Sequence, residues 1–494
     1  MIASDMNTLT RRSFLKTAAV AGAGAAASAV PTSTRAAPVG ASGAIRIAII
    51  GLGTKGRAHL KQLAGREDTR VVALCDVDEA VMARAVKEAE TSLAAPFTCT
   101  DARQIMARQD VDVIVIASGN HWHALQAVWG CQAGKDVYVE KPMTHTVWEG
   151  RQLIAAAAKY GRIVQAGTQY RSERGLAEGI EYVRSNALGR LTHVHAVYYG
   201  GRGAIKRREP WYPDFLDYNL FCGPTPMIPL EREKLHYDWH WSWATGNGEL
   251  GNNGVHLLDV ALRFIGADTA PRRILGLGGR FVHKDAADTP NTQIAVYDYP
   301  KVPVIYEGRA LSAKPGMAMM DQVNGVRVGV VAHCEGGYVS GLAGCAAHDP
   351  SGKVIKKFAG DGGRGHMDNF LQAVRSRRAA DLAAPATVGH VSAALCHYGN
   401  ISLRVGEATE PAAIARELES IPAAAGMSRS MQEHLQVHGI DLAQQRLTLG
   451  PWLELDPATD AITQVSSRDD AALARARYLL HEAQRPPFVI PEKV

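Results

Sequence analysis

Ile45-Arg46-Ile47-Ala48-Ile49-Ile50-Gly51-Leu52-Gly53-Thr54-Lys55-Gly56 is the stretch that decides the fold of the first part of the chain. The apolar residues of 45–50 predict a buried strand, and a helical pattern begins at Arg57, directly after the last glycine. In a G-x-G-x-x-G turn the glycines let the backbone approach a pyrophosphate, and free N–H groups at the helix start bind its charge. We therefore predict a dinucleotide site.

A carboxylate follows the second predicted strand. Residues 70–75 read as a strand that ends at Asp76, twenty residues beyond Gly56. An acid at this place accepts hydrogen bonds from both hydroxyls of an adenosine ribose and repels a 2′-phosphate. Because residues 77–79 contain no arginine, we expect NAD, rather than NADP, as the cofactor.

Strands and helices keep alternating up to residue 166. The predicted elements are helices at 79–89, 123–133 and 147–159, and strands at 112–117, 136–139 and 163–166. Such alternation predicts an α/β domain with a parallel, doubly wound sheet, which binds its ligand beyond the carboxyl ends of the strands. The residues that we expect to bind the cofactor at the turn and at these strand ends are Gly51, Gly53, Thr54, Lys55, Gly56, Asp76, Asn120, His123, Glu140, Lys141 and Gln169.

Two more motifs, taken with the glycine-rich turn, resemble the Gfo/Idh/MocA family of NAD(P)-dependent sugar and polyol oxidoreductases. They are Ser-Gly-Asn-His-Trp-His at 118–123 and Gly-Lys-Asp-Val-Tyr-Val-Glu-Lys-Pro at 134–142. The resemblance covers roughly residues 45–410. It implies a Rossmann domain, then an α+β domain built on an open, mostly antiparallel sheet, and it implies a homo-oligomer.

The same resemblance gives Lys141 a role, which is contact with the reacting hydroxyl and with the nicotinamide end of the cofactor. An ammonium there stabilises a developing alkoxide, and burial can lower the pKa of a lysine toward general-base use. Pro142 is expected to fix the strand end as a cis peptide or a rigid turn. His123 is either a catalytic group or part of a helix cap.

A second glycine-rich segment, Gly246–Phe264, runs into a helix near His256. The resemblance places an Asp-x-x-x-His pair here, but Asn252 stands where the acid is expected. Asparagine holds neither a proton nor a charge, so it can only orient a hydroxyl. His256 is then the best candidate base, with Lys141 as the alternative. Asp259 is a candidate partner of His256, or a structural residue.

Aromatic residues mixed with polar ones, typical of a carbohydrate site, occur at 236–243, His-Tyr-Asp-Trp-His-Trp-Ser-Trp. The alternating tryptophans predict equally well a strand with a buried aromatic face. The cysteines show no zinc spacing, so no metal is expected. The substrate contacts that we expect are Lys141, Arg171, Trp239, Asn252 and His256.

The N-terminus resembles a twin-arginine (Tat) export signal. Thr10-Arg11-Arg12-Ser13-Phe14-Leu15-Lys16 precedes a weakly apolar stretch at 17–30 and small residues up to Ala37. We therefore expect the Tat machinery as a partner and the periplasm or the exterior as the destination. The predicted organisation is a signal at 1–37, a Rossmann domain at 44–170, a substrate and oligomerisation domain at 171–410 and a C-terminal extension at 411–494.

Composition narrows the partners. The 494 residues include 54 basic and 49 acidic ones, a net charge of +5, which does not suit nucleic-acid binding. No apolar run approaches the ~18 residues that would insert stably into a membrane. The seven cysteines are an odd number without a C-x-x-C pair, and we expect buried free thiols.

Three functions remain open from the sequence. The leading one is an NAD-dependent oxidoreductase that acts on a hydroxyl of a sugar, polyol or glycoside and keeps its cofactor bound. An alternative is a redox-neutral, NAD-dependent glycosidase that works by oxidation, elimination and hydration. A catalytically inactive sugar-binding protein is the third, which Asn252 favours.

Overall fold

The computed structural model of this chain describes residues 43–89 and 95–494. The predicted export signal at 1–37 lies outside these residues. All seven cysteines are free and six of them are buried, which confirms the expectation of buried thiols. Within the described part of the chain, no helix combines the length and the apolar character that crossing a membrane requires.

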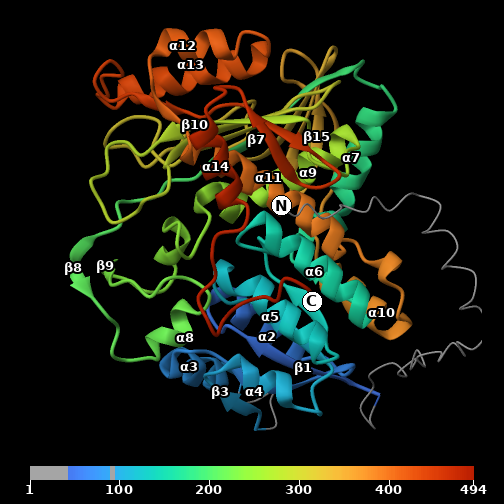
Figure 1. The fold of residues 1–494 in the computed structure, drawn as a ribbon. Coiled ribbons are helices and arrows are strands. Elements are labelled where there is room, and N and C mark those ends of the chain that lie inside the picture. The colour runs from blue at the N-terminus through green and yellow to red at the C-terminus, as the bar shows by residue number, and fades with distance from the viewer. Residues whose placement is uncertain (1–42, 90–94) are drawn as a thin grey trace, which may run out of the picture. The chain divides into compact units, whose positions relative to one another are not determined.

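Six parallel strands form the first sheet, in the order β3-β2-β1-β4-β5-β6 (Figure 1). This is the strand order of the doubly wound dinucleotide-binding fold, so the predicted fold class is confirmed. The strands are β1 Ile45–Ile50, β2 Thr69–Cys75, β3 Phe97–Cys99, β4 Val113–Ile116, β5 Asp136–Val139 and β6 Val164–Ala166. The helices are α2 Thr54–Ala64, α3 Glu79–Ala89, α4 Ala102–Ala107, α5 Asn120–Gln132 and α6 Val147–Tyr160.

Two of these helices begin earlier than predicted. α2 begins at Thr54 instead of Arg57, and α5 begins at Asn120 instead of His123. Each therefore starts directly after a glycine, Gly53 or Gly119, four residues beyond the last residue of the preceding strand. β3 and α4 escaped prediction because a three-residue strand and a six-residue helix carry too little periodicity to be recognised.

Twelve strands form a second, mostly antiparallel sheet, which confirms the predicted class of this half. The order is β16-β15-β14-β13-β7-β12-β11-β10-β18-β17, β19 pairs with β10 and β20, and only β7 and β12 run parallel. The strands are β7 Leu191–Tyr199, β10 Arg273–Gly279, β11 Thr292–Asp298, β12 Val304–Arg309, β13 Val328–Cys334, β14 Gly337–Leu342, β15 Gly344–His348, β16 Val354–Phe358, β17 Glu407–Thr409, β18 Leu447–Leu449, β19 Leu453–Asp456 and β20 Ala461–Val465.

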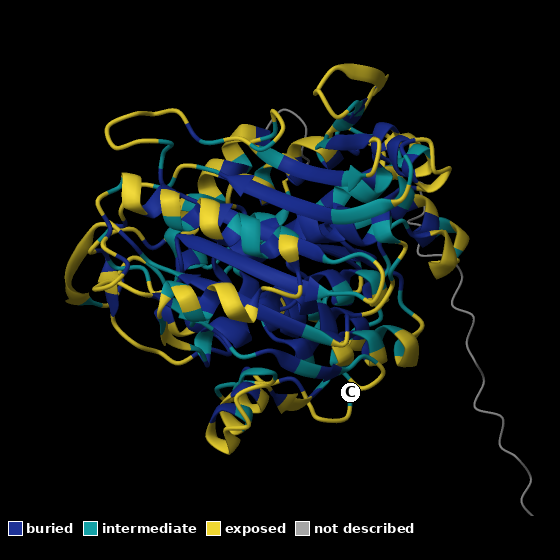
Figure 2. Cartoon of the chain, turned by 90° about the horizontal axis from the view of Figure 1, so that it is seen from above, coloured by how far each residue is buried: buried dark blue, intermediate teal, exposed yellow. Residues whose placement is uncertain are grey.

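Helices cover both faces of this sheet at β10–β12. Ile274, Ala295 and Tyr306 share one apolar core with α7 Arg174–Arg184, α9 Val255–Ile265 and α11 Ala386–Arg404. Residues that alternate with them along the strands, such as Leu275 and Ile294, pack on α12 Pro411–Glu417 and α13 Pro422–Val437. The strands are consequently buried on both sides, and Figure 2 draws them mostly in dark blue.

Segments from the last third of the chain pack on the first sheet and add strands to the second. α10 His366–Ser376 buries Met367, Phe370 and Leu371 in the same core as β1 of the first sheet. The residues after 410, predicted to be an extension, supply β18, β19 and β20 to the second sheet and continue into α14 Asp470–Leu479. The segment between β7 and α9 contains β8 Arg207–Trp211, α8 Tyr218–Cys222 and β9 Leu230–Arg232, and β8 pairs with β9.

Candidate active site

A cavity of 700 Å³ lies at the carboxyl ends of β1, β2, β4 and β5 and is called here the cofactor cavity. Its volume falls in the range of roughly 300–1,000 Å³ that small-molecule sites occupy. The predicted site residues that line it are Gly51, Gly53, Thr54, Lys55, Asp76, Asn120, His123, Glu140, Lys141, Trp239 and Asn252. The structure thus brings together residues from the glycine-rich turn, the strand ends and the second glycine-rich segment.

The glycines of the turn form a cradle. A Cβ on Gly51, whose φ is +84°, would lie 2.5 Å from the backbone nitrogen of Ser118, and one on Gly56 would lie 1.8 Å from the carbonyl oxygen of Gly51. A Cβ on Gly53 would instead meet nothing within 4 Å. Gly51 and Gly56 are therefore required by close packing, whereas Gly53 leaves open space beside the start of α2, where a pyrophosphate fits.

Asp76 closes the other end of the cradle. One of its oxygens accepts a hydrogen bond from the backbone N–H of Leu52 (2.6 Å), and the other accepts one from that of Asp78 (3.0 Å). Burial raises the pKa of Asp76, partly offset by these hydrogen bonds. Arg57 and Arg84 also line the cavity, and Arg57 forms an ion pair with Glu88. The prediction of NAD rested on the absence of arginine from residues 77–79 and did not take these two arginines into account.

Glu140 and Lys141 follow β5, and a cis peptide bond joins Lys141 to Pro142, one of the two expected forms. His59 Nε2 lies 2.8 Å from a carboxylate oxygen of Glu140. Burial alone would raise the pKa of Glu140, but the hydrogen bond to His59 and the charges of Lys55 and Lys141 lower it. Glu140 therefore stays a carboxylate beneath the lysine.

Lys141 reaches across to the second glycine-rich segment. Its Nζ donates to the carbonyl oxygen of Asn252 at 2.7 Å and to Asn252 Oδ1 at 3.1 Å. Burial lowers the pKa of Lys141, and the charges of Lys55 and Arg202 lower it further against the pull of Glu140. A neutral amine can make both of these bonds with its two hydrogens, which leaves its lone pair free to take a proton.

In the described part of the chain His256 does not line the cofactor cavity, although the charges of Lys141, Glu140 and Lys55 act on its ring. The ring packs edge-on against Tyr170 with centroids 5.2 Å apart, and Nδ1 has no hydrogen-bond partner in the described part of the chain. Burial and the charge of Lys141 lower the pKa of His256 well below its usual value. A buried, neutral imidazole off the cavity is a poor base, so Lys141 is the better of the two candidates.

Asp259 is not brought into contact with His256 by any described interaction. Its carboxylate is fully buried and accepts hydrogen bonds from Arg171 Nε (2.8 Å) and Ser392 Oγ (2.6 Å). Arg171 and Gln169 share the helical turn Gln169–Ser172, and in the described chain neither residue lines the cavity. The Arg171–Asp259 pair thus joins this turn to α9.

Two predicted residues hold the walls together. His123 places Nδ1 2.7 Å from the carbonyl oxygen of Pro142 and Nε2 2.9 Å from that of Ser118, while burial lowers its pKa. The side-chain amide of Asn120 donates to Asn247 Oδ1 at 3.2 Å. His123 is therefore a positioning residue for the segment that follows Lys141.

Several residues of the wall were not predicted. Arg202, Tyr198, Tyr237 and His240 line the cavity beside Lys141. His240 stacks on Trp239 with centroids 3.6 Å apart, and its Nδ1 lies 2.6 Å from the carbonyl oxygen of Tyr237. The aromatic motif at 236–243 was the available signal. Its alternative prediction, a strand, is wrong, because residues 238–241 form a helical turn.

Two family models match the chain in succession. The Gfo/Idh/MocA model described as an oxidoreductase family with an NAD-binding Rossmann fold matches residues 45–168. The model of the C-terminal alpha/beta domain of the same family matches residues 191–325. The two matches meet at the cofactor cavity, whose wall takes residues from both.

Curated relatives and solved structures agree with these models. An alpha-N-acetylgalactosaminidase of Shewanella oneidensis and a glycosyl hydrolase family 109 protein of Shewanella baltica are each 29% identical over 215 residues, 39% of this chain and 46% of theirs. The chain thus spans about half the length of these relatives. The WlbA dehydrogenase of Bordetella pertussis, solved with NADH and UDP-GlcNAcA, is 18% identical, covers 71% of this chain and 94% of its own, and shares the fold with a TM-score of 0.52.

Proposed function

This chain belongs to the Gfo/Idh/MocA oxidoreductase family and carries its NAD-binding Rossmann domain, and on that premise we propose that it oxidises a hydroxyl group of a sugar, polyol or glycoside while retaining its NAD. The observation that carries the proposal is the place of Lys141. Its amine stands in the wall of the cofactor cavity, held by Asn252, with a lowered pKa.

The residues of the cavity fit the cofactor. The open space at Gly53 and the N–H groups at the start of α2 suit a pyrophosphate, and the Asp76 carboxylate suits the adenosine ribose. Glu140 and Lys141 follow β5, and we expect the nicotinamide ring to lie beside them. NAD, when bound, supplies the acceptor for the hydride that leaves the substrate carbon.

The residues of this chain handle the proton. Lys141, as a neutral amine, takes the hydroxyl proton at Nζ, and the buried carboxylate of Glu140 stabilises the ammonium that forms. Asn252 fixes the direction of the Lys141 lone pair through its two acceptor oxygens. The stacked rings of Trp239 and His240 offer a flat surface for the C–H face of a sugar.

A second candidate function is glycoside cleavage without net consumption of NAD. The similarity to glycosyl hydrolase family 109 proteins, one of them an alpha-N-acetylgalactosaminidase, favours it. The same first step serves both functions, since oxidation of a ring hydroxyl acidifies the neighbouring C–H. A base then removes that proton, the glycosidic substituent leaves, water adds and the hydride returns.

Export with the cofactor aboard is part of the proposal. The motif at 10–16 supports the Tat route, which carries folded proteins. A protein that carries its NAD to the periplasm must then reoxidise the NADH formed there in place, by passing the hydride to a second sugar or back to its own product. Replacement of Arg11 and Arg12 by lysine should leave the protein in the cytoplasmic fraction, and periplasmic protein from that variant would contradict this route.

The experiment that tests the function starts from protein purified without added cofactor. We expect denaturation to release NAD or NADH. A panel of glycosides added to the native protein then distinguishes the candidates: lasting reduced nicotinamide indicates an oxidoreductase, and release of the aglycone without it indicates the glycosidase. Sugar binding without either signal indicates the third hypothesis, a catalytically inactive sugar-binding protein.

A further inference from the structure

A second cavity adjoins the cofactor cavity. Its volume is 470 Å³, which is large enough for a small-molecule group. Arg202 and Tyr237 line both cavities and form the wall between them. The lining of the second cavity also includes Trp241 and residues of β11 and β12.

The dividing wall is bonded to the catalytic residues. Arg202 donates to Glu249 at 3.0 Å, to the Tyr237 hydroxyl at 3.2 Å and to the Tyr198 hydroxyl at 2.9 Å. The other carboxylate oxygen of Glu249 accepts from the side-chain amide of Asn252 at 3.2 Å. A chain of hydrogen bonds therefore runs from Lys141 through Asn252 and Glu249 to the edge of the second cavity.

One buried hydroxyl in the second cavity lacks a partner. Tyr306 on β12 is fully buried and lines the cavity, and its hydroxyl makes no hydrogen bond to any of the residues that the structure describes. Buried hydroxyls in native proteins nearly always have partners. Tyr297 on β11, equally buried, donates to the carbonyl oxygen of Leu395 at 3.1 Å. The unpaired hydroxyl of Tyr306 points to a ligand as its partner.

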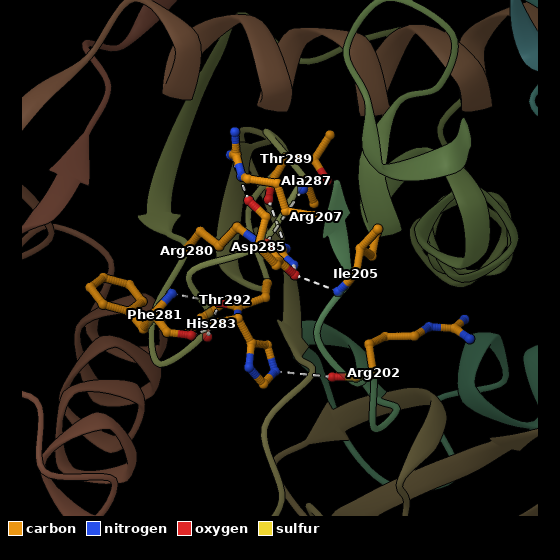
Figure 3. Close-up of polar contacts among 11 residues, drawn as sticks. Arg202, Ile205, Arg207, Arg280, Phe281, His283, Asp285, Ala287, Thr289 and Thr292 are labelled. Carbon is orange, nitrogen blue, oxygen red and sulfur yellow. Dashed lines mark hydrogen bonds and ion pairs between the residues drawn. The ribbon is translucent and has the colours of Figure 1, made fainter. Parts of the chain in front are cut away.

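Side-chain hydrogen bonds join residues 280–285 to residues 202–207 beside the second cavity (Figure 3). Asp285 accepts hydrogen bonds from Arg280 Nε and from the backbone N–H of Ile205, both at 2.7 Å. His283 Nε2 lies 3.2 Å from the carbonyl oxygen of Arg202. These contacts tie the backbone of residues 202–207, which lines the cavity, to side chains of residues 280–285.

The charges of the lining are largely neutralised. Five basic residues line the cavity, and four of them form ion pairs; these pairs are Arg202 with Glu249, Lys206 with Glu233, Arg280 with Asp285, and Arg309 with Glu307 and Asp321. The fifth, Lys234, lies near Asp238, whose pKa burial raises and Lys234 lowers in part. A lining without surplus charge suits a neutral group that carries hydroxyls.

We propose that the second cavity is a subsite for a neutral, hydroxylated substituent of the reacting sugar, the second saccharide unit of a disaccharide, which hydrogen-bonds to the Tyr306 hydroxyl. The inference rests on the proposed function, because it requires that the reacting sugar lies beside Lys141. It adds that the natural substrate is a glycoside with at least two sugar units rather than a free monosaccharide.

The test measures sugar binding to the NAD-loaded protein by calorimetry. The probes are pairs that share one non-reducing sugar: methyl α-glucoside with maltose, methyl β-glucoside with cellobiose, and methyl β-galactoside with lactose. The variant is Tyr306→Phe, which removes only the unpaired hydroxyl, and the matched control is Tyr297→Phe on the neighbouring strand. Thermal unfolding and NAD affinity of both variants establish that they are folded.

For at least one pair we expect the wild-type protein to bind the disaccharide about fivefold or more tightly than the methyl glycoside. Tyr306→Phe should abolish this advantage and leave methyl glycoside affinity unchanged, whereas Tyr297→Phe should keep the advantage. Equal affinities within every pair, an advantage that survives Tyr306→Phe, or the absence of disaccharide binding would overturn the subsite. In each of these cases turnover of a methyl glycoside would leave the proposed function standing, and failure to bind NAD would overturn both.

Discussion

The Nζ atom of Lys141 lies 2.7 Å from the backbone carbonyl oxygen of Asn252 and 3.1 Å from its side-chain oxygen. This contact joins the end of β5 to the helical turn that precedes α9, residues that lie 111 positions apart. Because Asn252 supplies two neutral acceptors and no charge, it orients the amine and stabilises an ammonium less than a carboxylate in its place would.

Replacement of Lys141 by methionine tests its role as the base. Methionine keeps a long apolar side chain but has no group that accepts a proton. We expect kcat to fall at least about 100-fold, as losses of positioned acid–base groups do, while NAD still binds. Steady-state kinetics and a cofactor titration measure the two effects, and a variant with wild-type kcat would contradict the assignment.

Replacement of Asn252 by aspartate tests the state of the lysine. If Lys141 acts as a neutral amine, kcat/KM rises with pH through its lowered pKa and then levels off. A carboxylate in place of the amide would stabilise the ammonium and raise the pKa of Lys141. The rising limb of the pH profile should therefore move to higher pH, and activity at neutral pH should fall. An unmoved limb, or one that moves to lower pH, would exclude Lys141 as the titrating base.

Alanine at two glycines separates binding from folding. A Cβ at Gly53 enters open space, so Gly53→Ala should keep the wild-type stability but weaken NAD binding by about tenfold or more, because the methyl group lies where the pyrophosphate approaches. A Cβ at Gly56 would meet the carbonyl oxygen of Gly51, so Gly56→Ala should lower the free energy of unfolding by about 1–3 kcal/mol. Calorimetric NAD titration and chemical denaturation of both variants give the comparison. Unchanged NAD affinity in Gly53→Ala would place the cofactor elsewhere.

Asp76 should determine the choice between NAD and NADP. Its removal in Asp76→Ala takes away the acceptor of the ribose hydroxyls and the repulsion of a 2′-phosphate. We expect NAD affinity to drop about tenfold and NADP affinity to rise relative to it, helped by Arg57 and Arg84 in the same cavity. Competition titrations with the two cofactors measure the ratio, and a ratio that stays at the wild-type value would remove Asp76 from the ribose site.

Asp259 is expected to matter for stability rather than for proton transfer. Its partner Arg171 keeps its charge in a mostly buried place, so Asp259→Asn leaves that charge without its carboxylate. The free energy of unfolding should fall by about 3 kcal/mol. The pH profile of kcat/KM should keep the position of its limb, and a displaced limb with unchanged stability would instead give Asp259 a catalytic role.

Local sequence was sufficient to predict the first half of the site. Gly51 and Asp76 stand directly after a strand and Lys141 stands two residues after one. In a parallel sheet the carboxyl ends of all strands meet at one edge. Their convergence on one cavity is therefore implied once the strands are recognised. The apolar runs between the predicted helices also sufficed to predict five of the six strands of the first sheet.

Position along a helix could not predict which side chains reach the cavity. His256 and Asp259 lie on α9, where nine of the eleven residues are buried, so no polar face marks the side that meets the cofactor. The pairing of Asp259 with Arg171 joins residues 88 positions apart. Likewise Arg202 and Glu249 meet across 47 positions, and no local pattern records that contact.

A single-turnover measurement on NAD-loaded protein, with a sugar that binds, compares the wild-type and Lys141→Met proteins side by side. We expect a transient or lasting rise of reduced-nicotinamide absorbance in the wild-type protein, and no such rise in the variant although it binds both ligands. The same rise in both proteins, or none in a wild-type protein that turns the sugar over, would contradict this expectation.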